Sequence, residues 1–569
     1  MSDGPGSAPT PDEQHGSPAQ GGDGHPARPF AITLEVGSSL PNRTGAWRTE
    51  RPSYVRRLPP CSDACPAGED VQRWLYEAET GGDGYERAWR SLVRENPFPA
   101  VMGRICYHPC ETACNRCELD EAVGINSVER FLGDEAIRLG WQLPAPPSAT
   151  GRRVLVVGAG PCGLSAAYHL ALRGHHVTVR DGARLPGGMM RYGIPAYRLP
   201  REVLDAEIER IVALGIELRC DEPVLDLEQE LREGGFDAAL LAVGAHVARN
   251  IDIPGGTAGR VMDAVSMLHG LAEGELPQLG RRVVVYGGGD TALDAARSAR
   301  RLTGAEPVII YRRTRERMPA HAEELEQAEQ EGITFRWLST ISAAEQGRLR
   351  IERMCLDENG MPQPTGEFEE LEADSVILAL GQNADLSLLE GFDRVNVGDG
   401  VVEVDERMMT GHPGVFAGGD MTPGERMAAV AIGHGRRGAR HIDGWLRKIE
   451  TSEPAHEKIA SFDTLNTWYY ADAPRTVSPL LEDVRRQSTF EEVVKGLDGE
   501  SALYEARRCL SCGNCFSCDN CYGVCPDNAV LKPGPPGEPY AFDLDYCKGC
   551  GICVAECPCG AIEMIPEEI

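Results

Sequence analysis

The sequence lacks several features that would direct the protein to a membrane or to nucleic acid. No apolar run is long enough to cross a bilayer as a helix. The first residues do not show the basic start and apolar stretch of a secretory signal. Basic residues are also scarce: 57 Lys and Arg stand against 87 Asp and Glu, a net charge of −30. This excess disfavours nucleic acid and anionic membranes as partners, and it fits either a basic protein partner or solubility alone.

Cysteine, by contrast, is abundant and unevenly placed. Of 20 cysteines, eleven lie between Cys509 and Cys559 and six between Cys61 and Cys117. Dense clusters in a large chain without a secretory signal indicate metal sites rather than disulfides. We therefore expect a cytoplasmic protein that works in reducing surroundings.

The chain is long enough for several domains, and its turn and strand patterns divide it. We predict an α/β protein with two interleaved Rossmann-like domains, one for FAD and one for NAD(P). An α-helical Fe–S domain precedes them, and an α+β bacterial ferredoxin domain follows them. The predicted ranges are a disordered tail at 1–45, the helical Fe–S domain at 46–148, FAD-binding parts at 149–255 and 396–448, the NAD(P)H-binding domain at 256–395, a linker at 449–508 and the ferredoxin domain at 509–569.

The strongest motif is a pair of C-x2-C-x2-C-x3-C-P runs near the C-terminal end. This spacing is typical of ferredoxins with two four-iron clusters, in which the fourth cysteine of each run ligates the other cluster. A zinc ribbon would instead need two C-x2-C pairs. The predicted ligand sets are Cys515, Cys518, Cys521 and Cys557 for one cluster, and Cys547, Cys550, Cys553 and Cys525 for the other.

The six N-terminal cysteines form a weaker pattern. Cys61 and Cys65 make C-x3-C-P, and four more follow after GRI. Six thiols suffice for one four-iron cluster but not for two with cysteine ligands alone, and zinc is an alternative. The sequence predicts one cluster in this N-terminal region, with ligands from Cys65, Cys106, Cys110 and Cys114. Among the C-terminal cysteines, Cys509, Cys512 and Cys559 have no assigned role.

A first dinucleotide motif opens the first α/β region. Gly158, Gly160 and Gly163 make G-x-G-x-x-G directly after the strand VLVV and before a helix. Such glycines let backbone N–H groups approach a pyrophosphate at the helix N-terminus. Asp181 follows at the end of the next strand, where a carboxylate accepts hydrogen bonds from the ribose. A purely structural turn is the alternative interpretation.

A second dinucleotide motif follows the strand VVVY and has the opposite charge signature. It comprises Gly287, Gly289, Asp290 and Thr291, and its second strand ends in arginines instead of an acid. Arginines there favour the 2′-phosphate of NADP(H) over NAD(H). The alternative is a solvated basic loop. The predicted phosphate ligands are Arg312, Arg313 and Arg317.

A flavin is implied by these two kinds of site together. Nicotinamides exchange electron pairs as hydride and clusters exchange single electrons, and a flavin can do both. Two further turns would complete its pocket, one with Gly188 and Met189 and one with Gly419 and Asp420. No catalytic side chain is required, and we expect His246 and His434 to be structural.

These motifs carry a resemblance to a known family. The strings PCSDACPAGED, VLVVGAGPCGLSAA, GGMMRYGIPAYRLP, VVVYGGGDTALDAAR, YRRTRERMPA and VFAGGD resemble the small subunit of glutamate synthase and the N-terminal half of dihydropyrimidine dehydrogenase. The resemblance implies FAD at the first loop, with Asp420 near its ribityl phosphate, and NADPH or NADH at the second. It also implies two N-terminal clusters, but the C-x2-C that normally precedes Cys61 is missing here.

The ferredoxin-like end is similar to that of fused flavoproteins that act with other redox enzymes. The resemblance implies an NAD(P)H:iron–sulfur acceptor oxidoreductase whose protein partner is a 2-oxoacid:ferredoxin oxidoreductase, a ferredoxin or a sulfite reductase. Two alternatives remain: a glutamate synthase small subunit that feeds a separate large subunit, and a non-catalytic redox scaffold or sensor. Members of such families often form homodimers.

Overall fold

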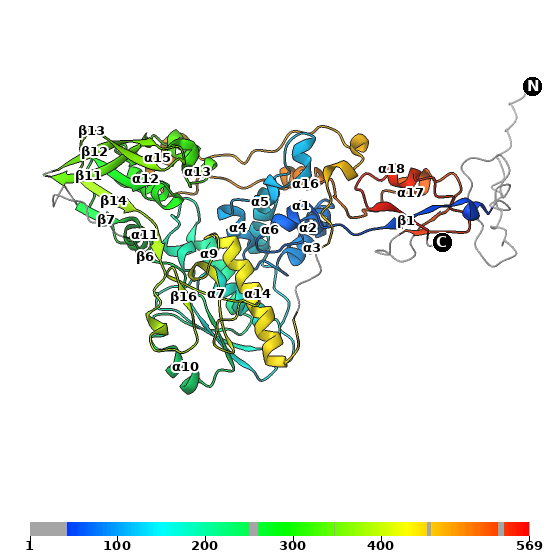
Figure 1. Cartoon of the computed structure of the whole chain (residues 1–569), viewed down its shortest axis with the longest axis horizontal. Coiled ribbons are helices and arrows are strands. Elements are labelled where there is room, and N and C mark those ends of the chain that lie inside the picture. The colour runs from blue at the N-terminus through cyan, green and yellow to red at the C-terminus, as the bar shows by residue number, and fades with distance from the viewer. Residues whose placement is uncertain (1–42, 250–259, 346, 452–456, 533–539, 568–569) are drawn as a thin grey trace, which may run out of the picture. The chain divides into compact units, whose positions relative to one another are not determined.

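The computed structural model describes residues 43–249, 260–345, 347–451, 457–532 and 540–567 (Figure 1). The chain divides into two compact units. The larger unit comprises Pro59–His456 and Asp472–Cys509, and the smaller one comprises Met1–Leu58, Glu457–Ala471 and Leu510–Ile569. Among the described residues, none of the helices has both the length and the apolar character needed to cross a membrane.

The larger unit begins with a group of short helices. In α2, Val71, Trp74, Leu75 and Ala78 recur at helical spacing and are buried, so this helix turns one apolar face to the core. Helix α16 (Gly499–Arg507), far along the chain, packs against α2 and α6. The group comprises α1 (Pro60–Ala64), α2 (Val71–Ala78), α3 (Asp83–Leu92), α4 (Pro99–Ile105), α5 (Pro109–Thr112) and α6 (Ile125–Leu139).

A five-stranded parallel sheet follows, in the order β18-β5-β2-β3-β4. Its central strands are continuous apolar runs because helices cover both faces. Helices α7 (Pro161–Ala171) and α14 (Ala428–Arg447) pack closely against each other beside it (Figure 1). The strands are β2 (Arg153–Val157), β3 (His176–Arg180), β4 (Glu217–Arg219), β5 (Ala238–Leu241) and β18 (Val415–Ala417), and the connecting helices are α8 (Met189–Tyr192), α9 (Arg201–Val212) and α10 (Leu227–Gly234).

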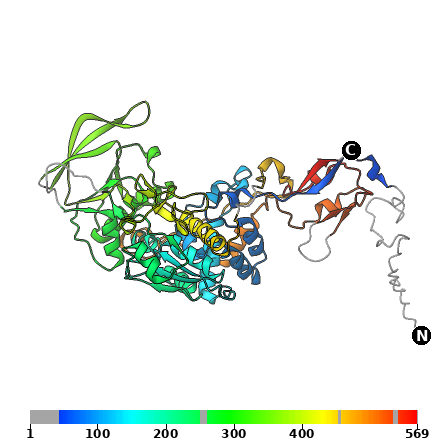
Figure 2. The same cartoon turned by 60° about the horizontal axis from the view of Figure 1, so that its bottom comes forward.

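A second parallel sheet, in the order β10-β9-β8-β14-β7, lies between β5 and β18 in the chain. The last strand of the first sheet therefore follows all strands of the second sheet along the chain, which confirms two interleaved Rossmann-like domains. An antiparallel three-stranded sheet extends from this domain (Figure 2). The elements are β7 (Arg260–Asp263), β8 (Val283–Gly287), β9 (Val308–Ile310), β10 (Thr334–Arg336), β14 (Ser375–Ala379), α11 (Ala264–Ala272), α12 (Asp290–Thr303), α13 (Ala322–Gln330), β11 (Ser339–Glu345), β12 (Arg348–Leu356) and β13 (Pro362–Glu372).

The smaller unit has a ferredoxin-like arrangement of short elements. Strand β1 (Glu50–Tyr54) pairs antiparallel with β21 (Ile562–Pro566), and β19 (Val530–Leu531) pairs with β20 (Ala541–Phe542). Helices α17 (Asn520–Gly523) and α18 (Ile552–Ala555) pack against each other. The Tyr54 ring stacks on Phe542 with 5.0 Å between ring centroids. The predicted fold class is confirmed for both units.

Two segments differ from the predicted domain ranges. Residues 50–54, which we assigned to the helical domain, pair with the last described strand of the chain. The sequence analysis missed this pairing because a partner so distant along the chain leaves no local signal. The predicted linker is divided: Glu457–Ala471 belongs to the smaller unit, and Asp472–Cys509 packs in the larger one. There, α15 (Asp483–Ser488) lies against α12.

Candidate functional site

The first glycine motif forms a tight turn between β2 and α7. Gly158 has a φ of +108°, and a Cβ there would stand 2.2 Å from the carbonyl oxygen of Ala242. A Cβ on Gly163 would stand 1.9 Å from the carbonyl oxygen of Gly158. Only glycine fits at these two positions, so the loop closes tightly and the N-terminus of α7 faces the end of the sheet.

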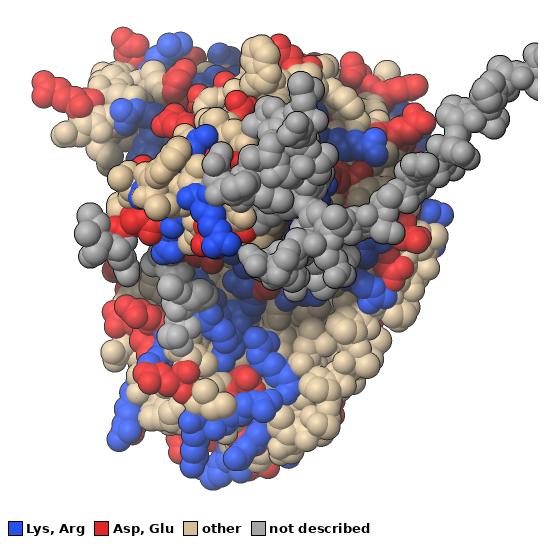
Figure 3. All heavy atoms as spheres, turned by 90° about the vertical axis from the view of Figure 1, so that its right-hand side faces the viewer, with Lys and Arg blue, Asp and Glu red and all other residues tan. Residues whose placement is uncertain are grey.

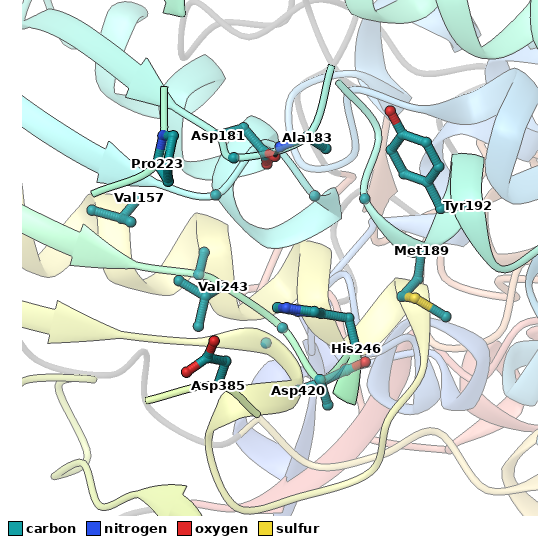
Figure 4. A pocket seen from close by; sticks show the side chains of 18 of the residues that line it. Val157, Asp181, Ala183, Met189, Tyr192, Pro223, Val243, His246, Asp385 and Asp420 are labelled. Atoms are coloured by element: carbon teal, nitrogen blue, oxygen red, sulfur yellow. Dashed lines mark hydrogen bonds between the residues drawn. The ribbon is translucent and has the colours of Figure 1, made fainter. Parts of the chain in front are cut away.

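A cavity of about 670 Å³ opens in front of this loop and is drawn in Figure 4. Its volume lies in the range of sites for small molecules and cofactors. It combines the carboxyl ends of the strands with the turn before α8 and the turn after β18. Seven predicted residues line it: Gly158, Gly160, Asp181, Gly188, Met189, Gly419 and Asp420. Gly163 packs behind the loop instead.

Asp181 lies at the cavity edge, directly after β3. Its carboxylate accepts hydrogen bonds from the backbone N–H groups of Ala159, at 2.5 Å, and Ala183, at 2.7 Å. These bonds fix the acid between the glycine loop and the next turn. Gly188 approaches from the other side, where a Cβ would stand 2.8 Å from the Cα of Gly160. The two glycines leave a narrow backbone cradle.

Asp420 lies on the 3-10 turn Gly419–Met421 after β18. Burial raises the pKa of its carboxyl group, and Arg426 acts in the opposite direction. His434 on α14 accepts a hydrogen bond at Nδ1 from the N–H of Gly419, and burial lowers the pKa of His434 to about 4. A neutral imidazole thus holds the turn that presents Asp420.

The sequence analysis did not predict several of the residues that line this cavity. Tyr192, His246 and Asp385 line the cavity and are labelled in Figure 4. The Tyr192 ring stacks on His269 with 4.3 Å between centroids. Tyr192 stands in the string GGMMRYG, so the motif held a signal for it. His246 and Asp385 follow strands of no recognisable motif, and only the tertiary structure brings them here.

The second glycine motif joins β8 to α12. Gly287 ends the strand, Gly289 caps the helix, and a Cβ on Gly289 would meet no atom within 4 Å. Asp290 accepts a hydrogen bond from the backbone N–H of His321, and its other carboxylate oxygen lies 3.0 Å from His321 Nδ1. Thr291 accepts a bond from Gln382. The four predicted residues therefore share one edge of the second sheet.

The predicted arginines follow β9, the strand next to β8. Because these strands are parallel, Arg312 and Arg313 lie at the same sheet edge as the glycine turn. Arg312 is exposed, and neither guanidinium forms an ion pair with any described residue. Arg315 pairs with Glu329 instead, and Arg317 lies against Gly360, near Asp357.

The C-terminal cysteines lie in two groups, and each group has members from both runs. Cys525 lines one small cavity together with the second triplet, Cys547, Cys550 and Cys553. Cys557 interacts electrostatically with the first triplet, Cys515, Cys518 and Cys521. The Tyr54 hydroxyl lies 3.2 Å from the sulfur of Cys521. Each group thus takes three thiols from one run and one from the other, and soft thiolates of this kind suit iron–sulfur clusters.

The N-terminal cysteines divide into two sets. Cys65, Cys106 and Cys110 line one cavity, whereas Cys114 is not among its described lining residues. Two buried acids, Glu69 and Glu129, line the same cavity and share the side-chain amide of Asn96. Burial raises the pKa of Glu69 to about 7 and that of Glu129 well above its usual range. No motif in the sequence pointed to these acids.

No three His, Cys, Asp or Glu side chains within the described ranges stand close enough together to hold a single metal ion. A cubane holds its ligands apart by its own width, so such compactness is not required of cluster ligands. On the surface, basic side chains gather over the lower part of the face in Figure 3, although the whole chain is strongly acidic.

The fold and the first cavity define a class: oxidoreductases with two interleaved dinucleotide-binding domains. Residues 152–435 match the pyridine nucleotide-disulphide oxidoreductase family. Residues 50–141 match the family of dihydropyrimidine dehydrogenase domain II, 4Fe–4S cluster, and residues 540–563 match the 4Fe–4S binding domain.

Several curated proteins are similar over most of their length. The chain is 36% identical to the NADP(+)-dependent formate dehydrogenase subunit beta of Moorella thermoacetica, covering 80% of this chain and 70% of that protein. It is 32% identical to the NADPH-Fe(3+) oxidoreductase subunit beta of Geobacter sulfurreducens (81% and 77%). It is also 32% identical to the glutamate synthase [NADPH] small chain of Azospirillum brasilense (68% and 87%).

The chain therefore belongs to the family of FAD-dependent NAD(P)H oxidoreductases with iron–sulfur clusters that includes the glutamate synthase small subunit. It is an electron-transfer flavoprotein whose cofactors are FAD, a nicotinamide nucleotide and 4Fe–4S clusters. The two regions that match 4Fe–4S families precede and follow the region that matches the pyridine nucleotide-disulphide oxidoreductase family.

Proposed function

We propose that the protein is an NADP(H):iron–sulfur acceptor oxidoreductase that exchanges electrons with a separate protein partner. The carrying observation is the combination in one chain of a dinucleotide cavity, a second glycine turn beside two arginines that form no ion pair with the described residues, and two crossed thiol groups. When bound, FAD supplies the conversion between hydride transfer and single-electron transfer. We place the protein in the cytoplasm, where thiol ligands stay reduced.

The first cavity suits FAD. Its glycine cradle leaves room for a pyrophosphate only because Gly160 and Gly188 have no side chains there. Asp181 stands where a carboxylate would accept the ribose hydroxyls, in competition with its present bonds to Ala159 and Ala183. Asp420, whose pKa burial raises, would donate or accept a hydrogen bond at the ribityl end.

The second turn suits NADP(H). Gly289 leaves open space for a pyrophosphate at the N-terminus of α12. Arg312 and Arg313 are available to pair with a 2′-phosphate, and guanidinium–phosphate pairs are strong because they are charge-assisted and often bidentate. All three of the relatives described above are named for NADP(+) or NADPH, which supports the same preference. Arg317 would contribute from the following 3-10 turn, Arg315–Arg317.

The comparisons support a class of partner protein rather than one particular partner. Relatives named as beta subunits of a formate dehydrogenase and of an Fe(3+) oxidoreductase support a redox enzyme as the other subunit. A 2-oxoacid:ferredoxin oxidoreductase, a ferredoxin or a sulfite reductase would meet the same requirement for one-electron exchange. The formate dehydrogenase relative aligns with 80% of this chain and the glutamate synthase relative with 68%. This difference favours a redox enzyme of these kinds as the partner over the large subunit of a glutamate synthase.

Viologen reduction tests the proposal. Anaerobically purified protein should reduce benzyl viologen with NADPH and do so more slowly with NADH. No turnover with either nucleotide would support the redox scaffold instead. Co-purification from the native source separates the partners: a large glutamine-dependent subunit would support the glutamate synthase alternative. Size-exclusion chromatography with light scattering would show whether the chain forms a homodimer.

A further inference from the structure

Four thiols in the larger unit remain outside the cavity of Cys65, Cys106 and Cys110. They are Cys61, Cys114, Cys117 and Cys509. Cys61 and Cys110 are buried members of the apolar core formed by α2, α3 and α6, and Cys65, Cys114 and Cys509 pack against that core. Three segments that are far apart in the sequence thus bring thiols to one hydrophobic region.

The segment before Cys509 is fixed to the loop that follows Cys114. The Arg116 guanidinium donates to the carbonyl oxygen of Arg508. The Arg508 guanidinium in turn donates to the carbonyl oxygens of Glu121, at 2.7 Å, and Ala122, at 2.8 Å. Both arginine side chains are almost fully buried, so these contacts hold the chain immediately before Cys509 against this loop.

Helix α16, which precedes Cys509, is bound to the same loop. The buried carboxylate of Glu505 accepts hydrogen bonds from the backbone N–H of Gly124, at 2.7 Å, and from Arg508, at 3.0 Å. The backbone N–H of Cys509 donates to the carbonyl oxygen of Ala506, so this cysteine directly continues the end of the helix. The position of Cys509 is therefore set by a network of buried charges.

The sulfur of Cys114 has the surroundings of a ligand. The backbone N–H groups of Arg116 and Val123 donate hydrogen bonds to it. Hydrogen bonds to sulfur are a general feature of iron–sulfur sites and tune their potentials. Cys114 also interacts electrostatically with Cys117, three residues on. Cys114 is not among the described residues that line the cavity of Cys65, Cys106 and Cys110, where Glu69 and Glu129 supply two further carboxyl groups.

The family resemblance implies a second four-iron cluster in the helical domain, and we propose that Cys509 is one of its ligands, together with Cys61 and Cys114. Cys509, from the far end of the chain, supplies a thiolate in place of the C-x2-C pair that is missing before Cys61. A further thiol, Cys117, stands at C-x2-C spacing after Cys114 in the sequence. The alternative is that these thiols are small buried apolar side chains without a ligand.

Iron analysis and EPR of the full-length chain test this assignment. Four cubanes require about sixteen irons per chain, whereas three require about twelve. We expect about sixteen in the anaerobically purified protein and about twelve in Cys509→Ser, with one EPR signal of the dithionite-reduced protein lost. Cys61→Ser and Cys114→Ser should lose the same signal. A wild-type content of about twelve irons, or a Cys509→Ser protein with unchanged iron, would overturn the proposal.

Matched controls separate cluster loss from misfolding. Cys355→Ser changes an exposed thiol on β12 and should keep every iron and every signal. The flavin content of Cys509→Ser, measured by absorbance, should equal that of the wild type. If Cys509→Ser fails to fold, Cys61→Ser and Cys114→Ser still decide, because loss of two different signals from these two variants contradicts a shared cluster. These readouts do not depend on NADPH turnover, so the proposed function can fail independently.

Discussion

The two glycine turns share a sequence pattern but differ in what their surroundings allow. The first glycine is crowded in both turns, because a Cβ would stand 2.2 Å from the carbonyl oxygen of Ala242 at Gly158 and 2.2 Å from that of Ala379 at Gly287. The turns differ in what lies beside them. A cavity of about 670 Å³ opens in front of the first loop, whereas Arg312 and Arg313, which form no ion pair with any described residue, follow the strand next to the second. The comparison separates a dinucleotide site with a large cavity from one marked by basic side chains, as expected for a resident flavin and an exchanging nicotinamide.

The largest effect is expected from a substitution that disrupts the first turn. Gly158→Ala places a Cβ at a positive φ and 2.2 Å from the Ala242 carbonyl oxygen, so both strain and a clash follow. We expect a loss of about 1–3 kcal/mol of stability from the backbone strain and loss of most bound FAD. Flavin absorbance after gel filtration and thermal unfolding measure the two effects. A variant with full flavin content would contradict the assignment of the first turn to FAD.

The next largest effect concerns the charge signature of the second turn. The double variant Arg312→Ala/Arg313→Ala removes two cations that have no ion pair among the described residues. If each makes a charge-assisted bond worth about 1.5–3 kcal/mol, kcat/KM for NADPH should fall by at least about tenfold while that for NADH stays constant. Arg315→Ala, whose guanidinium pairs with Glu329, serves as the control. An equal loss with both nucleotides would refute the NADP(H) preference.

A smaller effect is expected from a substitution at Gly289 in the second turn. Gly289→Ala adds a Cβ in open space at a φ of −94°, so folding and flavin content should not change. The new methyl group would nevertheless stand where the backbone must approach a pyrophosphate. We expect KM for NADPH to rise by roughly fivefold, about 1 kcal/mol. Unchanged kinetics would show that the dinucleotide does not bind at this turn.

The smallest effect tests the turn that carries Asp420. The pKa of His434 is lowered to about 4, chiefly by burial. In the unfolded chain its pKa is near 6.5, so the unfolded state binds the proton more readily. The contribution of His434 is fully present above about pH 6.5 and is lost as pH falls toward 4. His434→Asn keeps an acceptor for the Gly419 N–H, so its thermal midpoint should fall less on acidification, by about a degree or two.

How much the sequence predicts depends on whether a signal is local. The glycine turns, Asp181 and the two C-x2-C-x2-C runs lie within short stretches whose spacing reflects a chemical requirement. His246 and Asp385 at the first cavity carry no comparable spacing. His246 follows β5 and Asp385 follows β15 (Gln382–Asn383), so only the tertiary structure brings them to the cavity.

The sequence by itself determined the class of chemistry, because cluster and dinucleotide motifs hold their ligands within one loop or one strand–turn–helix unit. Tertiary structure decided the rest. It paired β1 with β21, placed Glu69 and Glu129 beside the cysteines of the helical domain, and brought Cys509 to the core that contains Cys61. Such contacts depend on burial of side chains and backbone groups from remote segments, and remote burial leaves no periodic trace in the chain.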